Sequence, residues 1–561
     1  TGLLILSLTV AGSVAAQSDA VADTVYEFPP VVIIGKAIVD QTTIRDNGSK
    51  ISSVSSTQIR DLNATDLPSA LRRVPGVTIS RYNLVGSYGG GEGGTIYIRG
   101  QGTSRPGSSI QTMVDGVPKF VGIWTHPLMD ILDVDRAEQI DVYKSPQSVQ
   151  YGNMSLGAVN MVTRRMHQQG HRTSMTAIGG QENTYSLNFT HGGKSGDFDY
   201  YFGGTARGSE GHRENADGQL RSWWGRSGYQ FNDNWNASVI VSGSDNWADD
   251  PGPVGGGPPP RGRFNTSDYS VNATLANRSE RTSGFLRFYA DDGAIGWEQW
   301  SNTTNNWFNT ETDWLNSGLR LQQSILLGGA TELTLGFDYD SYGGEVWEQH
   351  ADPANDKRLP EVNFSNTAGY AQLKHTFDLG GGTLLQPSAG ARFNYHNTFE
   401  DQFAPELGVT LGREKWTVFG NYTRGFNYAG VYSVWFYDVS WNQPDGYKDL
   451  EAELVDHYEL GLKLQPSHRA AFEFSVFHDR GSNRIRMLPP PPPPPVFVNI
   501  DSYEITGFET SFSWSPISSL SLFTGLPLLS MPPESMPQSP GYTFTVGGNY
   551  RFLKKFQLSA D

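Results

Sequence analysis

The sequence predicts a mainly β protein: a large antiparallel β-barrel that crosses a membrane, preceded by a smaller α/β domain. Three observations support this. Short runs in the later part of the chain alternate apolar and polar side chains, as in a wall with one apolar and one polar face. The connections between these runs are short on one side and mostly long on the other. After the N-terminus, the 561 residues hold no apolar run of about 18 residues, which excludes membrane-spanning helices.

The composition agrees with an exported wall of strands. Hydrophobic residues make up 37% of the chain and the mean hydropathy is −0.43, as alternating strands produce. The absence of cysteine suits a compartment in which a stray thiol would be oxidised. The net charge of −16 argues against a nucleic-acid partner, because phosphates require a basic face.

The N-terminal residues predict export followed by a flexible tether. Residues 1–16 read as a partial secretory signal peptide, with an apolar run from Leu3 to Val14 and small residues before Gln17. Residues 17–39 are polar except for an apolar island at 30–35. The β-branched side chains of this island suit a short strand that adds to the sheet edge of a partner; its residues are Val31, Val32, Ile33, Ile34 and Gly35.

Residues 40–168 predict a compact α/β unit. A helix is expected within 51–80, where Asn63 or Thr65 caps it and Pro75-Gly76 end it. Its apolar stripe consists of Leu67, Leu71 and Val74.

From about residue 170 the pattern changes to amphipathic strands. Tyr185, Leu187 and Phe189 alternate with polar residues, and a similar alternation runs from His457 to Leu464. A soluble sandwich would give the same alternation, but it has no reason to segregate its loops by length. Short connections are expected around 192–193, 232–234, 279–282, 328–329, 380–382, 412–415, 466–468, 515–518 and 553–554. Longer ones are expected at 246–266, 342–363, 428–450, 481–496 and 527–540.

Several motifs occur in an order that resembles a known family. They are Leu71–Val77 (LRRVPGV), Ile98–Gly100 (IRG), Val114–Pro118 (VDGVP) and Glu138–Arg165 (EQIDVYKSPQSVQYGNMSLGAVNMVTRR). Together they resemble the plug-domain signatures of TonB-dependent outer-membrane receptors of the siderophore or cobalamin type. Residues 421–426 and 450–463 resemble barrel segments of the same family, so the resemblance covers nearly the whole chain.

The resemblance implies a barrel of about 22 strands whose lumen holds the α/β unit as a plug. Hairpin signals give about 18 to 19 strands, so we expect the chain to be truncated at both ends. The expected domains are the partial signal peptide (1–16), a periplasmic tether with a TonB box at 30–35 (17–39), the plug (40–168) and an incomplete transmembrane barrel (169–561).

The resemblance also implies a function and partners. It implies TonB-dependent import of a scarce metal chelate across the outer membrane of a Gram-negative bacterium. A ferric siderophore is the first expectation, and cobalamin or another metal complex is the alternative. The implied partners are TonB with ExbB and ExbD, outer-membrane lipid and lipopolysaccharide, and the chelate itself. We expect a monomer. A passive porin or a surface adhesin is the rival from another class.

Three segments carry the candidate ligand-binding residues. The glycine-rich segment 81–94 holds Arg81, Tyr82 and Tyr88, and the segment 119–130 holds Trp124, His126 and Met129. For His126 and Met129, two interpretations stay open: contact with a metal or its chelate, or packing beneath a loop. The third segment, 428–441, is aromatic and is able to stack on a planar chelate; it contributes Tyr432, Trp435 and Tyr437.

The sequence holds no nucleophile elbow, no H-E-x-x-H motif and no phosphate loop, so we expect neither an enzyme nor a resident cofactor. The 11 histidines show no paired metal-ligand spacing, so no structural metal site is expected. The tryptophans at 297, 300, 307 and 314 are interpreted as an aromatic girdle at the lipid headgroups. The proline run Pro489–Pro495 is interpreted as a stiff spacer in an exposed loop.

Overall fold

A computed structural model describes residues 41–79, 94–102, 107–251, 261–301, 306–488, 496–531, 539–552 and 556–561. The predicted signal peptide (1–16), the tether (17–39) and the proline run at 489–495 lie outside the described residues. Among the described residues, no helix has the length and apolarity needed to cross a membrane.

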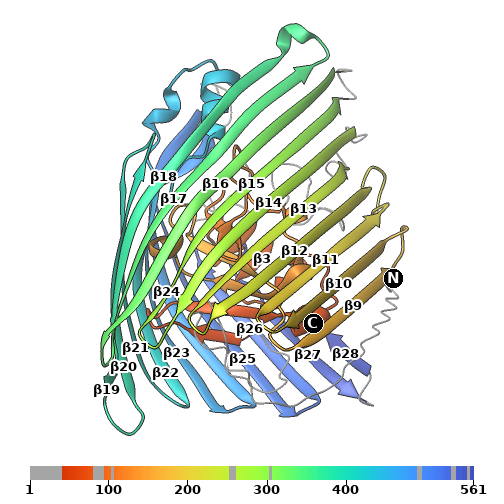
Figure 1. Ribbon diagram of the computed structural model, residues 1–561. Helices are drawn as coiled ribbons and strands as arrows, with labels where there is room; N and C mark the ends of the chain where they lie inside the picture. The colour runs from red at the N-terminus through yellow and green to blue at the C-terminus, as the bar shows by residue number, and fades with distance from the viewer. Residues whose placement is uncertain are drawn as a thin grey trace.

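Most of the chain forms one antiparallel sheet that curves around a lumen (Figure 1). The sheet follows sequence order and its strand order places β28 beside β9, although no residue register joins these two strands among the described residues. Its strands are β9 Gly170–Gly179, β10 Tyr185–Ser195, β11 Phe198–Ser209, β12 Gly218–Asn232, β13 Trp235–Asp250, β14 Arg261–Arg278, β15 Thr282–Ser301, β16 Asn306–Gly328, β17 Thr331–His350, β18 Lys357–His375, β19 Phe377–Asp378, β20 Leu384–His396, β21 Gln402–Arg413, β22 Trp416–Asn427, β23 Glu453–Ser467, β24 Ala470–Leu488, β25 Val496–Ile517, β26 Leu520–Ser530, β27 Thr545–Phe552 and β28 Phe556–Ala560.

The described wall has nineteen strand positions, because β18 and the two-residue β19 both pair with β20. The count agrees with the predicted 18 to 19 strands, and the predicted antiparallel barrel with an N-terminal plug is confirmed.

The polarity of the wall is reversed relative to a soluble protein. On β10, Leu187 and Phe189 are 47% and 42% exposed, whereas Ser186 and Thr190 are buried. On β23, Leu460 is exposed and Glu459 is buried. Apolar side chains therefore cover the outside and polar side chains fill the inside, which is the arrangement of a wall in lipid.

Several predicted connections differ from those observed. Residues 192–193 lie within β10, and the turn follows at 196–197. The predicted long loop at 342–363 shrinks to 351–356, because β17 and β18 continue well beyond the length needed to cross a bilayer. Alternating side chains predict where pairing begins, but they do not show how far it extends past the lipid. Trp314 is also buried on the lumen side, so its assignment to the girdle was wrong.

The N-terminal unit lies inside the wall as a plug, drawn in red and orange in Figure 1. Its main sheet has the order β1-β2-β7-β8-β5-β6, in which only β5 and β8 are parallel; β3 and β4 form a separate pair. The strands are β1 Gln41–Ile44, β2 Lys50–Ser55, β3 Val77–Ile79, β4 Ile96–Ile98, β5 Ile110–Val114, β6 Val117–Pro118, β7 Ala137–Tyr143 and β8 Gly157–Thr163. The helices are α1 Ser56–Asp61, α2 Leu67–Leu71 and α3 Ser148–Tyr151, with 3-10 turns η1 Met129–Ile131 and η2 Val134–Arg136.

The predicted helix exists but is divided in two. Asp66 caps α2 in a capping box with Ser69, so the predicted caps Asn63 and Thr65 were wrong. Asn63 has φ of +49° and lies in the turn between α1 and α2. An aspartate directly before the helix competes well for this position, because its carboxylate accepts the backbone N–H at N3.

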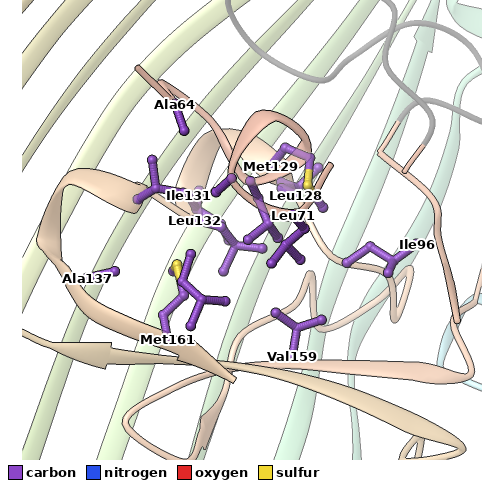
Figure 2. Packing of buried hydrophobic residues seen from close by; sticks show 14 of the residues in the cluster. Ala64, Leu71, Ile96, Leu128, Met129, Ile131, Leu132, Ala137, Val159 and Met161 are labelled. Atoms are coloured by element: carbon purple, nitrogen blue, oxygen red, sulfur yellow. The ribbon is translucent and has the colours of Figure 1, made fainter. Parts of the chain in front are cut away.

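The plug core lies between the helices and the sheet (Figure 2). Leu71 from α2 packs with Leu128, Ile131 and Leu132 of the segment before η2, and with Val159 of β8. The predicted stripe residues Leu67, Leu71 and Val74 are all buried. This core makes the plug a folded unit that presents charged residues to the wall.

Candidate functional site

Ion pairs buried at one side of the plug join it to the wall. Three plug cations meet three wall carboxylates there. Arg99 follows β4 and binds Glu459 at 2.8 Å and Glu509 at 3.2 Å. Lys50 opens β2 and Lys144 follows β7, and both bind Glu509.

We call these six residues the plug–wall charge cluster: Lys50, Arg99, Lys144, Glu459, Glu473 and Glu509. Glu473 lies 3.6 Å from Lys50. All six side chains are buried, and the formal charges balance. Breaking one partner from such a set leaves an uncompensated charge in a dry environment, which costs about 3–5 kcal/mol.

The plug side of the cluster has perturbed proton affinities. Burial disfavours the charged form of Arg99, but Glu459 and Glu509 outweigh burial and raise the pKa of its guanidinium. For Lys144, burial lowers the pKa to about 8 and the neighbouring Lys50 and Arg99 act in the same direction, opposed by Glu509. Of the three plug cations, Lys144 is therefore the one whose charged form its surroundings favour least.

Other sides of the plug carry similar contacts. Lys119, beyond β6, binds Asp268 on β14 at 2.5 Å and Asp291 on β15 at 2.6 Å. Asp135 in η2 pairs with Arg207 on β11. The plug is thus held by ion pairs at several positions around the lumen.

The first described residues of the plug have their own contacts with the wall, separate from the charge cluster. Asp46 pairs with Lys374 on β18 at 2.5 Å. Asn47 donates to Glu406 on β21, and Lys463 on β23 donates to the backbone oxygen of Thr42. These contacts lie next to β1, the edge strand that directly follows the predicted tether.

Above the plug, the connection 428–452 forms an aromatic cap. It contains the short helix α4 Tyr432–Val434, the π-helix η4 Trp435–Ser440 and the 3-10 turn η5 Gly446–Asp449. The backbone N–H of Tyr432 donates to the oxygen of Ile123 in the plug at 2.8 Å. Trp124 of the plug packs edge-on against Trp435 and Phe436, with ring centroids 6.4 and 6.3 Å apart.

The structure brings together some of the predicted ligand-binding residues. Trp124 of the plug meets Tyr432 and Trp435 of the aromatic cap, and Tyr437 donates from its hydroxyl to the oxygen of Phe497. Tyr432, Trp435 and Tyr437 are buried, so in this state their rings contact protein.

His126 and Met129 are also enclosed. Met129 belongs to the plug core shown in Figure 2, and His126 Nδ1 lies 3.1 Å from the oxygen of Pro127. Arg81, Tyr82 and Tyr88 lie outside the described residues, as do Val31, Val32, Ile33, Ile34 and Gly35. The ligand and TonB roles of all these residues stay predictions.

Sequence reasoning missed the charge cluster. The motifs contained Arg99 and Lys144, but nothing local marked Lys50, whose partner Glu509 lies 459 positions away. One signal is present in the sequence: Glu459 is a charged residue on the polar, lumen-facing side of the alternating run from His457 to Leu464. No group of three or more metal-ligating side chains occurs within the described ranges.

Family models match both parts of the chain. The model described as "TonB dependent receptor-like, beta-barrel" matches residues 169–560, and the "TonB-dependent Receptor Plug Domain" model matches residues 43–159. These matches follow the same division as the observed wall and plug.

Individual proteins are similar over most of the chain. The "Iron-regulated outer membrane virulence protein" of Vibrio cholerae is 24% identical, over 94% of this chain and 84% of its own length. The ferric yersiniabactin uptake receptor FyuA of Yersinia pestis superposes with a TM-score of 0.70 at 15% identity, covering 89% of this chain and 83% of that one. The copper transporter OprC gives a TM-score of 0.73 at 12% identity, covering 92% and 84%. At these identities the two structures show a shared fold.

Proposed function

The chain belongs to the TonB-dependent receptor family of the outer membrane, and from this membership we propose that it imports a scarce metal chelate, with a ferric siderophore as the cargo. The iron-regulated relative of Vibrio cholerae supports iron as the metal. Cobalamin or another metal complex is the alternative cargo, and no catalytic step or resident cofactor is part of the proposal.

The observation that carries this proposal is the occupied lumen. The plug lies inside the wall and buried charges tie it to the wall at several positions. A passive pore would need an open lumen. Passage of a chelate therefore requires the plug to move or remodel, and breaking buried ion pairs needs an energy source.

We propose that this energy comes from the inner-membrane proton gradient through TonB, ExbB and ExbD. TonB would take hold of residues 30–35 and pull on β1, whose neighbours Asp46 and Asn47 are bound to the wall. Bound chelate favours this step only if it contacts the two plug states differently. The protein would act as a monomer among outer-membrane lipid and lipopolysaccharide of a Gram-negative cell.

The test is deletion of residues 30–35 in cells that carry this receptor alone. Uptake of radioactive iron as a ferric siderophore should stop while surface binding at 4 °C is retained. The matched control deletes residues 18–23, six positions of the same tether, and should keep uptake. Uptake that survives loss of residues 30–35 would show a passive porin, and binding without uptake in the unaltered protein would indicate an adhesin.

A further inference from the structure

The two ends of the wall carry different charge. Turns on one side contain two to five residues, and this side faces the periplasm in barrels of this type. The described connections on this side hold four acidic and three basic residues, a net charge of −1. The described connections on the opposite, extracellular side hold two basic residues, Arg213 and Lys448, and twelve acidic ones, a net charge of −10. The acidic residues are Glu182, Glu210, Glu214, Asp217, Asp352, Asp356, Glu400, Asp401, Asp438, Asp445, Asp449 and Glu451.

This extracellular acidic rim faces solvent and has little internal compensation. None of the twelve side chains is buried. Within the rim, Asp445 pairs with Lys448 at 2.6 Å. Burial, together with the negative charges of Asp249 and Glu210, raises the pKa of Asp217. The negative charges around Asp217 are therefore close enough to repel one another.

Three basic residues at the extracellular strand ends pair with carboxylates of the same or a neighbouring strand. Arg263 pairs with Asp249 at 2.6 Å. Arg358 pairs with Glu345 at 2.9 Å, and Lys357 with Glu348 at 3.1 Å. An anionic ligand approaching this end would meet a negative potential.

Unfilled hydrogen-bond acceptors at the base of the aromatic cap also favour a cationic or hydrogen-bond-donating ligand. Asn427 is the last residue of β22, directly before the cap, and Asn394 on β20 interacts with Tyr428 of the cap. Both amides are buried, and each has a side-chain oxygen without a hydrogen-bond donor. Unfilled acceptors are suited to a ligand that donates hydrogen bonds or carries positive charge.

We propose that the acidic rim selects the charge of the cargo: the receptor takes chelates that are cationic or neutral and disfavours anionic ones such as ferric tris-catecholates. This inference rests on the proposed function and specifies its substrate class. A field of one sign over a concave mouth raises the encounter rate of oppositely charged ligands by about 10- to 1000-fold and lowers it for like charge. The effect weakens with salt, because the rim lies in solvent.

The experiment compares three ferric chelates in cells and on the purified full chain. Ferrioxamine B carries a free ammonium group and is cationic, its N-acetyl derivative is neutral and otherwise identical, and ferric enterobactin is a tris-catecholate anion. The expected order of association rate is cationic, then neutral, then anionic. The advantage of the cationic chelate over the neutral one should be at least about tenfold at low salt and should shrink as salt rises.

A triple variant tests whether the charges of the rim, and not those of the lumen, cause this preference. Glu400→Gln, Asp401→Asn and Asp449→Asn together remove three exposed rim charges, and should reduce the cationic advantage at least threefold while leaving the neutral chelate unchanged. The matched control, Asp197→Asn, Asp233→Asn and Glu280→Gln, removes three charges from the opposite turns and should change neither rate.

Each outcome bears on the proposal. Preferred binding of the tris-catecholate, or rim variants with the wild-type salt dependence, would overturn charge selection and leave the importer intact. Failure of all three chelates to enter the cell would overturn the ferric-chelate function, and the charge inference with it.

Discussion

Lys50 and Lys144 bind the same oxygen atom. Their Nζ atoms lie 2.5 and 2.7 Å from Oε1 of Glu509, while Arg99 binds the other oxygen of that carboxylate at 3.2 Å. One wall residue therefore holds three plug cations that come from separate parts of the plug sequence. Any movement that withdraws β2 takes Lys50 with it and leaves Glu509 to the other two.

Glu509→Gln should loosen the plug without altering the wall. The amide keeps the shape but removes the negative charge, so Lys50 and Lys144 stay buried with too little compensation, at a cost of about 3–5 kcal/mol. Cells should become more sensitive to large antibiotics that an intact plug excludes. Glu504→Gln on the same strand is the control, because Glu504 is exposed and pairs loosely with Arg480 at 3.7 Å. Equal antibiotic resistance in both variants would argue against the role of the charge cluster.

Gly408→Ala should weaken the seating of the plug against the wall. A methyl group at this position of β21 would overlap the backbone of Asn47, which cannot swing away as a side chain could. Overpacking of this kind costs about 1–3 kcal/mol, and protease cleavage within residues 41–55 should become faster. Gly369→Ala on β18 is the matched control, since its added methyl would meet nothing within 4 Å. A cleavage rate unchanged by Gly408→Ala would contradict the observed contact.

The wall and the plug were predictable because their signals are local. Alternation over a few residues decides which side of a strand faces lipid, and Leu187 and Ser186 follow it. The motifs around Arg99 and Lys144 lie within short stretches of chain. Lys50 could not be recognised, because its role depends on how the plug sheet is rotated against β24 and β25, and no local pattern encodes that rotation.

The candidate site was predictable only in part, for a similar reason. The aromatic composition of 428–441 singled out Tyr432 and Trp435, which do lie in one cluster, although their ligand role stays a prediction. Sequence alone could not tell that this segment folds back onto Ile123 and Trp124 of the plug, since the contact depends on a backbone hydrogen bond between distant segments. A ring that suits stacking on a ligand suits packing on another ring equally well.

Trp124→Ala should release the aromatic cap from the plug. The change removes the edge-on contacts with Trp435 and Phe436. Trp124 is partly buried, so the cost should lie below the roughly 3–5 kcal/mol of truncating a fully buried tryptophan. Hydrogen exchange in residues 428–441 should rise by at least about tenfold, whereas exchange in β7 should stay unchanged. Trp223→Ala, on the outer face of β12 and 49% exposed, is the control. Exchange that does not change in the cap would show that its contacts with the wall suffice to hold it.

The stability of the plug should fall as pH rises from about 4 to about 6, owing to Asp141. Burial raises the pKa of this carboxyl from 3.8 to about 6, against the hydrogen bonds from Ser53 and Gln139. Between these two pH values the folded plug binds more protons at this position than the unfolded chain, so stability decreases with pH. The penalty levels off only as the pH passes above the folded-state pKa and amounts to at most about 3 kcal/mol.

Asp141→Asn removes the ionisation and should abolish this dependence. Exchange of the β2 and β7 amides, measured at matched pH in both proteins, should be similar at pH 4. At pH 7 the unaltered protein should exchange faster than the variant. Asp66→Asn is the control, since this residue retains its capping role in α2 as asparagine. Slower exchange in the unaltered protein at pH 7 would mean that Asp141 is stabilised as an anion and that its hydrogen bonds outweigh burial.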